Sequence, residues 1–183
     1  PGVPHHVTQR GNNHQDVFFV DDDRRVYLGL LKRAAAQYGL LIHGYCLMTN
    51  HIHLVAVPAT EDSLHQALKP LHMRYAQRIN RAHGWTGHVW QGRFFSSALD
   101  EAYLWAAVRY VEHNPVRARM VRKAENDRWS SASAHCGARP DAVLTPKPFW
   151  RKQFEAIGEW SAWLAQGDEP SVLEVLRRNT DKG

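Results

Sequence analysis

The pattern of hydrophobic and polar positions in the N-terminal part of the chain predicts several short strands. Residues 3–9 have strand character and stop at Arg10-Gly11-Asn12-Asn13, a turn signal, so they predict a first strand. Residues 40–46 predict a second strand, and the β-branched and aliphatic run that starts at His51 predicts a third. Met48-Thr49-Asn50, between these two runs, is either a turn or the middle of one longer strand.

A glycine-punctuated aromatic segment lies further along, at 84–92. The short stretch 93–97 has strand character, and we expect the two segments to form a hairpin. Aromatic side chains flank Arg93 here, and two interpretations are open: either they stack nucleic-acid bases or they form the core of the hairpin. These side chains are Trp90, Phe94 and Phe95.

Two stretches between the strands show the 3.6-residue period of amphipathic helices. The first helix is predicted over 21–38, where aspartates can cap its start and Gly39 can close its end. The second is predicted over 63–79. Pro70 lies inside this second pattern, so we expect the helix to be kinked or divided there.

A third helix is predicted over about 100–114, because Pro115 disfavours helical backbone in the residue before it. Residues 137–148 are rich in Gly and Pro and predict a linker, and two short amphipathic helices are expected over 149–164 and 171–178. The order of elements is typical of an α+β fold, with an antiparallel sheet and helices packed on one side of it.

The composition changes this picture little, but the net charge indicates the class of molecule that the chain could bind. Of 183 residues, 44% are hydrophobic, and no apolar run is long enough to span a membrane. The two cysteines lie far apart, which excludes a disulfide framework and fits a reducing, cytoplasmic compartment. The net charge of +5 fits a polyanionic partner such as nucleic acid.

The positive charge is concentrated in two places. One helical face of the second predicted helix carries Arg74, Arg78 and Arg81, which form either a solvated face or a weak nucleic-acid contact. The segment after Pro115 is the densest basic run in the chain. Its cations are Arg117, Arg119, Arg122, Lys123 and Arg128.

The third strand carries a pair of histidines, His51 and His53. Side chains two residues apart in a strand point to the same face, so these imidazoles project together while Ile52 and Leu54 enter the core. Two imidazoles on one face form half of a divalent metal site. The alternative is a pair of exposed strand histidines, and a partner elsewhere in the chain is needed to decide.

The third helix supplies candidates for that partner. At about 100° per residue, Tyr110 and Asn114 lie roughly 40° apart on one face. Glu112 points about 200° away from Tyr110 and is poorly placed to share a site with it. Alone, each of these residues has an ordinary structural explanation.

Together, four ordered motifs resemble the REP-associated tyrosine transposases, a single-tyrosine branch of the HUH endonuclease superfamily. The motifs are NHIHLV, WQGRF, RYVEHNPVRA and WSS, preceded by HHVTQRG. The resemblance runs from about Val7 to His135. It implies a catalytic domain over 1–135 with a ferredoxin-like antiparallel sheet, followed by a linker and helical extension over 136–183.

The resemblance also implies roles for individual residues. His51 and His53 would be metal ligands, Asn114 the third ligand and Tyr110 the nucleophile. An amide oxygen suits Mg²⁺ or Mn²⁺ better than zinc, so one of these is the expected cofactor. Tyr110 would displace a 3′-hydroxyl and hold the 5′-phosphate of a DNA strand covalently.

The substrate implied by the resemblance is single-stranded or hairpin DNA of the repetitive extragenic palindrome (REP) type, with a short unpaired tetranucleotide beside the stem. The expected DNA contacts are Arg10, Arg93, Arg117, Arg119 and Arg122. We expect a monomeric cytoplasmic protein associated with the nucleoid. Two rival interpretations are a hairpin-binding protein without turnover and a small zinc hydrolase built on the histidine pair.

Overall fold

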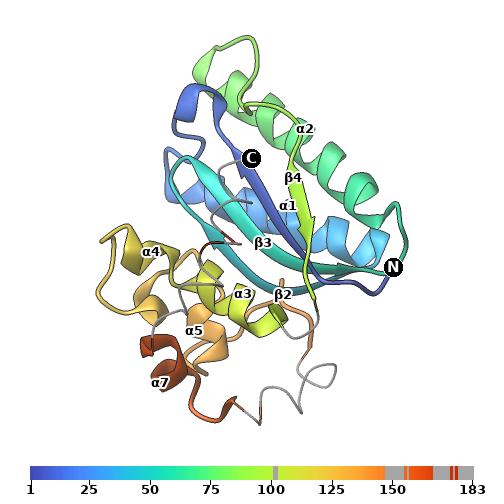
Figure 1. Ribbon diagram of the computed structural model, residues 1–183. Coiled ribbons are helices and arrows are strands. Elements are labelled where there is room, and N and C mark those ends of the chain that lie inside the picture. The colour runs from blue at the N-terminus through green and yellow to red at the C-terminus, as the bar shows by residue number, and fades with distance from the viewer. Residues whose placement is uncertain (101–102, 147–154, 156, 167–173, 175, 177–183) are drawn as a thin grey trace.

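The chain folds around a four-stranded antiparallel sheet with strand order β2-β3-β1-β4 (Figure 1). The computed structural model describes residues 1–100, 103–146, 155, 157–166, 174 and 176. The strands are β1 (His5–Arg10), β2 (Leu40–Leu47), β3 (His51–Pro58) and β4 (Phe95–Ala98). The α+β class and the antiparallel sheet predicted from the sequence are confirmed.

β3 and β1 are the central strands of the sheet, and β2 and β4 form its edges. β2 ends before Met48 and β3 begins at His51, so the intervening segment is a turn and not part of one long strand. In the β1–β3 register, Thr8 lies opposite His53 and Arg10 lies opposite His51. The polar end of β1 is therefore the direct neighbour of the histidine pair.

The predicted hairpin between 84–92 and 93–97 is wrong. β4 pairs with β1, with Thr8 opposite Phe95, and forms an edge of the sheet. Trp90 forms a bridge to Gly11 and is 6% exposed, and its indole N–H donates to the main-chain carbonyl of His72. A local sequence pattern cannot show that β1, far away in the chain, offers a better pairing edge. Trp90 belongs to the core and not to a surface that stacks bases.

Two long helices, α1 (Asp21–Tyr38) and α2 (Ser63–His83), cover one face of the sheet (Figure 1). Asp23 accepts hydrogen bonds from the main-chain N–H groups that precede α1, and Gly39 ends the helix in a left-handed conformation. Pro70 does not divide α2, which is one helix. Burial of the apolar residues on either side of Pro70, including Leu68 and Leu71, offsets the lost hydrogen bond.

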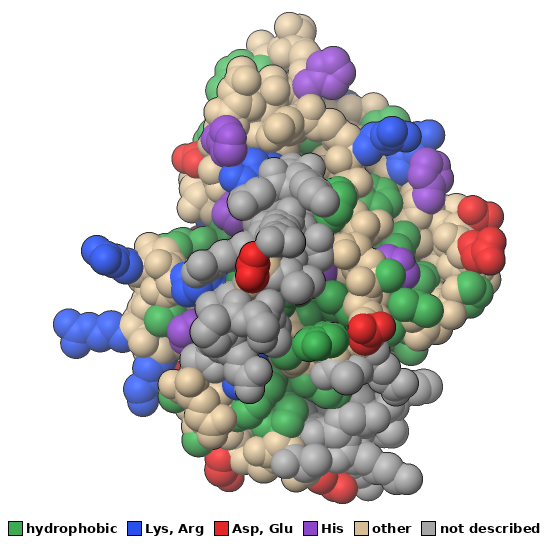
Figure 2. Space-filling view, viewed as in Figure 1, with side chains coloured by type: hydrophobic (Ala, Val, Ile, Leu, Met, Phe, Trp, Pro, Cys, Tyr) green, Lys and Arg blue, Asp and Glu red, His purple; other side chains and the backbone are tan. Residues whose placement is uncertain are grey.

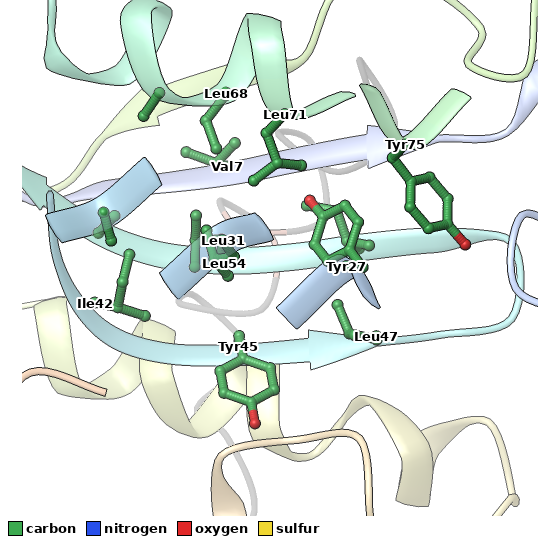
Figure 3. Packing of buried hydrophobic residues seen from close by; sticks show 14 of the residues in the cluster. Val7, Tyr27, Leu31, Ile42, Tyr45, Leu47, Leu54, Leu68, Leu71 and Tyr75 are labelled. Carbon is green, nitrogen blue, oxygen red and sulfur yellow. The ribbon is translucent and has the colours of Figure 1, made fainter. Parts of the chain in front are cut away.

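Figure 3 shows how this side of the sheet is filled. Strand residues meet the inner faces of both helices, and their side chains form one continuous apolar cluster. Members of the cluster include Val7, Leu54, Leu31, Leu68 and Leu71. The cluster fixes the alternation of β1 and β3, because the residues between these apolar positions must point to the opposite face.

α3 (Leu104–Glu112) packs on that opposite face, against β2 and β3, so the prediction that all helices lie on one side is wrong. The reason lies in the strands. Val55 and Cys46 are buried on the α3 side, so both faces of the β2–β3 hairpin are apolar and both must be covered. Gly44 lets the helix approach closely, since a Cβ there would lie 3.0 Å from Val108 Cγ1.

Shorter elements complete the described chain. They are η1 (Asn12–His14), α4 (Asn114–Arg117), η3 (Ala124–Asn126), α5 (Ala132–His135) and α7 (Trp160–Ala165). The helix predicted over 149–164 is broken at Gly158, which is left-handed, and residues 147–154 and 156 lie outside the described part. Most of the helix predicted over 171–178 also lies outside it.

The C-terminal segments pack on the domain. Thr145 donates a main-chain hydrogen bond to Ile42 of β2, and Trp160 and Leu164 of α7 are buried in the α3 cluster. The division of the chain at residue 135 stays a prediction. No helix among the described residues has the length and apolarity needed to cross a lipid bilayer.

Gly44→Val should destabilise the fold by about 1–3 kcal/mol, because the added side chain pushes α3 away from β2. Urea unfolding followed by circular dichroism measures the effect. Gly29→Ala is the matched control, since the nearest atom to its added Cβ is the end of Arg33 at 3.9 Å. This control should be neutral or stabilising by up to about 1 kcal/mol. Equal unfolding midpoints for Gly44→Val and the wild type would contradict the close packing of α3.

Candidate active site

Two histidines project from β3 toward the face that α3 covers. The ring centroids of His51 and His53 are 4.9 Å apart. Ile52 and Leu54, which alternate with them, belong to the core on the other face. The structure thus has both imidazoles on one face, as strand alternation predicts.

Hydrogen bonds at the Nδ1 atoms orient both rings. Nδ1 of His51 lies 2.6 Å from Oδ1 of Asn50, and an amide oxygen only accepts, so Nδ1 carries the proton. The Nε2 lone pair of His51 is then available to a cation. Nδ1 of His53 lies 3.1 Å from Nε2 of His6. When His53 donates this hydrogen bond, its own Nε2 also keeps a lone pair that is available to a cation.

Burial keeps both imidazoles neutral near pH 7. It lowers the pKa of His51 from its ordinary value of 6.5 to about 4, with smaller contributions from the positive charges of Arg10 and His14. Burial also lowers the pKa of His53 well below its ordinary value, and the neighbouring His51 and His6 add to the effect. A neutral imidazole is the form that binds metal.

His6 is a site residue that the sequence reasoning missed. It is buried on β1, and its ring stacks parallel to that of His53 with centroids 5.3 Å apart. Its Nε2 is hydrogen-bonded to Nδ1 of His53. Burial lowers the pKa of His6 to about 4. The signal was present in the alternation of β1, because His6, Thr8 and Arg10 share a face, but the pairing of β1 with β3 was needed to use it.

Tyr110 reaches the histidines from α3. Its side chain is buried, and its ring centroid lies 6.2 Å from that of His53 and 5.9 Å from that of His6. Both contacts are edge-to-face, a favourable arrangement for aromatic rings. The tyrosine therefore packs across the interface between α3 and the sheet, on the face that carries the histidine pair.

Arg117 holds the helical segment around Tyr110. Its guanidinium carbon lies 4.1 Å from the centre of the Tyr110 ring, a cation–π contact. The same guanidinium donates to the main-chain carbonyl of Tyr110 and, at 2.9 Å, to Oδ1 of Asn114. The sequence predicted Arg117 as a DNA contact, which stays a prediction, and its side chain is half-buried against the ring of Tyr110.

Asn114 begins α4, one turn after Tyr110. Its Oδ1 accepts from Arg117, and its Nδ2 is buried with no hydrogen-bond partner among the described residues. An amide oxygen has two lone pairs, so Oδ1 keeps one for a cation. Oδ1 is therefore the atom of Asn114 that could bind a cation, and Nδ2 could donate to a ligand oxygen.

Glu112 anchors the end of α3 on the side away from Tyr110. It is fully buried and accepts hydrogen bonds from the hydroxyl of Ser131 at 2.5 Å and from the indole of Trp160 at 2.8 Å. Nδ1 of His135 lies 2.5 Å from the same carboxylate. A buried carboxylate is tolerated only when it is paired in this way. The network ties α3 to α5 and α7, and Glu112 does not share the site of Tyr110, as the helical count predicts.

The other predicted DNA contacts are partly or fully exposed. Arg10 is half-buried at the end of β1, where Nη1 lies 3.0 Å from Nδ1 of His14, and Arg93, Arg119 and Arg122 are exposed. Figure 2 shows Lys and Arg side chains projecting from the α4 side of the molecule. Arg78 contributes to the contact between α1 and α2 through an ion pair with Asp22 at 2.6 Å.

The residue types of the predicted ligand set suit a divalent cation. Among the described residues, no three His, Cys, Asp or Glu side chains form a group that could hold a metal ion. The candidate set is instead His51, His53 and Asn114, with oriented imidazoles and an amide oxygen that has a lone pair left. Two nitrogens and one oxygen leave room for phosphate and water oxygens, which Mg²⁺ and Mn²⁺ accept.

Comparison with known proteins gives the class to which this fold and site belong. The family model for IS200-like transposases matches residues 3–114, which include β1, the histidine pair, Tyr110 and Asn114. The chain therefore belongs to the IS200-like transposase family. A comparison with curated protein sequences found no match.

Solved structures extend the comparison of the fold. The chain is similar to a REP-associated tyrosine transposase bound to a REP hairpin, with a TM-score of 0.59 and 16% sequence identity over 79% of this chain and 86% of that one. A second solved structure, of a protein from Deinococcus radiodurans R1, shares 20% identity over 61% of this chain and 89% of that one. Its TM-score of 0.44 is too low to inform the fold.

Stability should fall as the pH is lowered from about 6.5 toward 4. Burial lowers the pKa of His6, His43 and His51 to about 4, while the unfolded chain takes up protons below about 6.5. The unfolded state therefore binds more protons in this window, and the stability present above it is lost as the pH falls. Thermal unfolding at a series of pH values should show Tm decreasing.

Replacement of one buried histidine supplies the control for this prediction. His6→Asn should reduce the dependence of Tm on pH between about 6.5 and 4, since one titrating group is removed. Replacement of the exposed His88 by Gln should leave that dependence unchanged. An identical pH dependence in His6→Asn and the wild type would contradict the assignment.

Proposed function

We propose that the chain is a metal-dependent single-stranded DNA endonuclease and strand transferase that cleaves at or near REP-type hairpins. The observation that carries the proposal is the packing of the Tyr110 ring against His53 and His6, on the face of the histidine pair. Membership of the IS200-like transposase family supports the reaction class. The REP hairpin bound to a protein of similar fold supports the substrate class.

The proposed reaction is an in-line displacement at phosphorus. The Tyr110 oxygen attacks the scissile phosphate, a P–O bond to the tyrosine forms, and the P–O bond to the 3′ oxygen breaks. The phenol gives up its proton and the leaving 3′ oxygen takes one up, so the products are a 5′-phosphotyrosine and a free 3′-hydroxyl. Attack by another 3′-hydroxyl reverses the step and joins strands without ATP.

Different residues of the chain have different roles in the proposed reaction. His51, His53 and Asn114 would hold Mg²⁺ or Mn²⁺, which when bound supplies Lewis-acid polarisation of the scissile phosphate. His6 orients the ring of His53 through Nδ1. Arg117 fixes the main chain of Tyr110 and packs over its ring. A nucleophile held in this way loses little freedom on the way to the transition state.

DNA binding is proposed to depend on cations around the site. Arg10 lies next to the histidine strand, and the exposed Arg93, Arg119 and Arg122 can contact phosphates without fixing sequence. We propose that one chain carries out the reaction as a monomer, because the contact between Tyr110 and His53 is made within a single chain.

The covalent intermediate tests the proposal directly. Hairpin oligonucleotides with unpaired flanks, incubated with the protein and Mn²⁺, should yield an adduct that survives SDS and denaturing electrophoresis. Tyr110→Phe should abolish the adduct, because the attacking oxygen is missing, while the Tm and the hairpin Kd change little. Tyr103→Phe, in an exposed tyrosine at the start of α3, is the matched control and should retain the adduct.

The same experiment separates the proposal from its rival. A hairpin-binding protein without turnover would bind the oligonucleotide and form no adduct in any variant. An adduct of normal yield in Tyr110→Phe would place the nucleophile elsewhere and contradict the assignment.

Replacement of the histidines tests the metal set. His51→Ala and His53→Ala should each lower the rate of adduct formation by at least about a hundredfold, by analogy with the loss of other electrostatic catalytic groups. Hairpin binding measured by fluorescence anisotropy should be largely retained, because phosphate and base contacts lie elsewhere. The exposed His88→Ala is the control. Wild-type rates in both variants with Mg²⁺ would exclude these ligands.

A further inference from the structure

A pocket of about 310 Å³ lies on the face of the sheet opposite Tyr110, between β1, α2 and the segment that precedes β4. The residues of its wall come from distant parts of the chain and have three kinds of chemistry: a buried amide, aromatic rings and cations. They include Gln9, His65, Lys69, His72, Arg93 and Phe94. None of these residues belongs to the tyrosine site.

The buried amide is that of Gln9, which is only 2% exposed. Its Nε2 donates to the main-chain carbonyl of Gly92 at 3.0 Å, and this bond fixes the orientation of the amide. Among the described residues, its Oε1 accepts no hydrogen bond. A fixed amide with an open acceptor can read the donor on the edge of a nucleobase.

The aromatic part of the wall is formed by Phe94 and His72. Their ring centroids are 6.2 Å apart, and His72 is held in place by a 3.0 Å hydrogen bond to the hydroxyl of Tyr27. Burial lowers the pKa of His72 to about 3, so this ring is neutral near pH 7. His72 is buried and supports the ring of Phe94, which is partly exposed and offers a flat surface on which a base can stack.

The cations of the pocket are exposed. Lys69 extends from α2 and Arg93 from the segment before β4, and both reach solvent. Figure 2 shows Lys, Arg and His side chains gathered beside α2 on the side of the molecule that carries β4. Positive charge beside an aromatic and amide wall matches the two parts of a nucleotide, its phosphate and its base.

The pocket lies close to the tyrosine site although it opens on the other face. Gln9 directly precedes Arg10, which lies opposite His51 in the β1–β3 register. The N–H of Gln91 donates to the carbonyl of Arg10, so the segment that leads to Arg93 follows the edge of the sheet beside the site. Neighbouring strands are about 5 Å apart, so one DNA strand that crosses this edge can contact both places.

We propose that this pocket binds one unpaired nucleotide of the substrate strand, with the base against Phe94 and the Gln9 amide and the phosphate against Lys69 and Arg93. The proposal rests on the proposed function, because the ligand is part of the same DNA. It gives Arg93 a defined role and makes base identity at one unpaired position a determinant of binding.

An abasic scan combined with a side-chain substitution tests the pocket. Hairpins with randomised unpaired flanks are first selected for binding to the full chain, and each flank position of a selected hairpin is then replaced by an abasic nucleotide. Loss of the base at one position should weaken wild-type binding roughly tenfold, a typical value for a stacked base. The same abasic replacement should have no further effect in Phe94→Ala, since its stacking partner is already absent.

Two further variants keep the test independent of folding effects. Phe94→Leu preserves more of the packing than Phe94→Ala, and in this variant too the abasic replacement should have no further effect. Tyr103→Ala, which removes an exposed aromatic ring elsewhere, should retain the full abasic penalty.

The scan contradicts the pocket in two cases: no flank position is sensitive to base loss, or the sensitive position is equally sensitive in both Phe94 variants. Adduct formation through Tyr110 is measured in parallel on the same oligonucleotides. If the adduct forms but the effect of base loss does not depend on Phe94, the pocket proposal fails while the proposed function stands. If the effect of base loss depends on Phe94 but no adduct forms, the chain binds DNA as inferred and the catalytic proposal fails.

Discussion

The contact of Tyr110 with His53 and His6, across the interface between α3 and the sheet, is the interaction on which the site depends. Tyr110 could not reach these imidazoles if α3 lay further from β2 and β3. Gly44 permits the close approach, and the bonds of Glu112 to Ser131 and Trp160 hold the far side of the helix. The geometry of the nucleophile is therefore determined by packing at some distance from the reacting atoms.

The two faces of the sheet have different tasks. The face under α1 and α2 is filled with aliphatic and aromatic side chains and supplies most of the burial that stabilises the domain. The opposite face buries His6, His53 and Thr8 beside apolar residues, which is costly unless the polar groups find partners. The hydrogen bond between the imidazoles of His6 and His53 reduces this cost. The apolar burial under α1 and α2 therefore offsets the cost of burying polar side chains on the face that α3 covers.

Local periodicity was enough to predict much of this arrangement. The limits of α1 and the β2 strand follow from capping residues and alternation, and the same-face placement of His51 and His53 follows from the two-residue period of a strand. The placement of Tyr110 on the side of α3 away from Glu112 follows from the helical period. Each of these features depends on neighbours in sequence, which a pattern can show.

The features that the sequence did not predict depend on long-range pairing. β4 pairs with β1 and not with its own flanking segment, and α3 covers the second face of the sheet. His6 could be recognised as a partner of His53 only when β1 was known to lie beside β3. In each case two segments far apart in the chain come together, and the free energy of their contact is not visible in either segment alone.

The most direct measurement of the central claim is the chemical identity of the bond between protein and DNA. After incubation of the full chain with a hairpin oligonucleotide and Mn²⁺, proteolysis and tandem mass spectrometry locate the modified residue and the end of DNA attached to it. The account predicts a single phosphodiester between the Tyr110 oxygen and a 5′-phosphate, with a free 3′-hydroxyl on the released strand. Attachment at any other side chain, or through a 3′-phosphate, would contradict it.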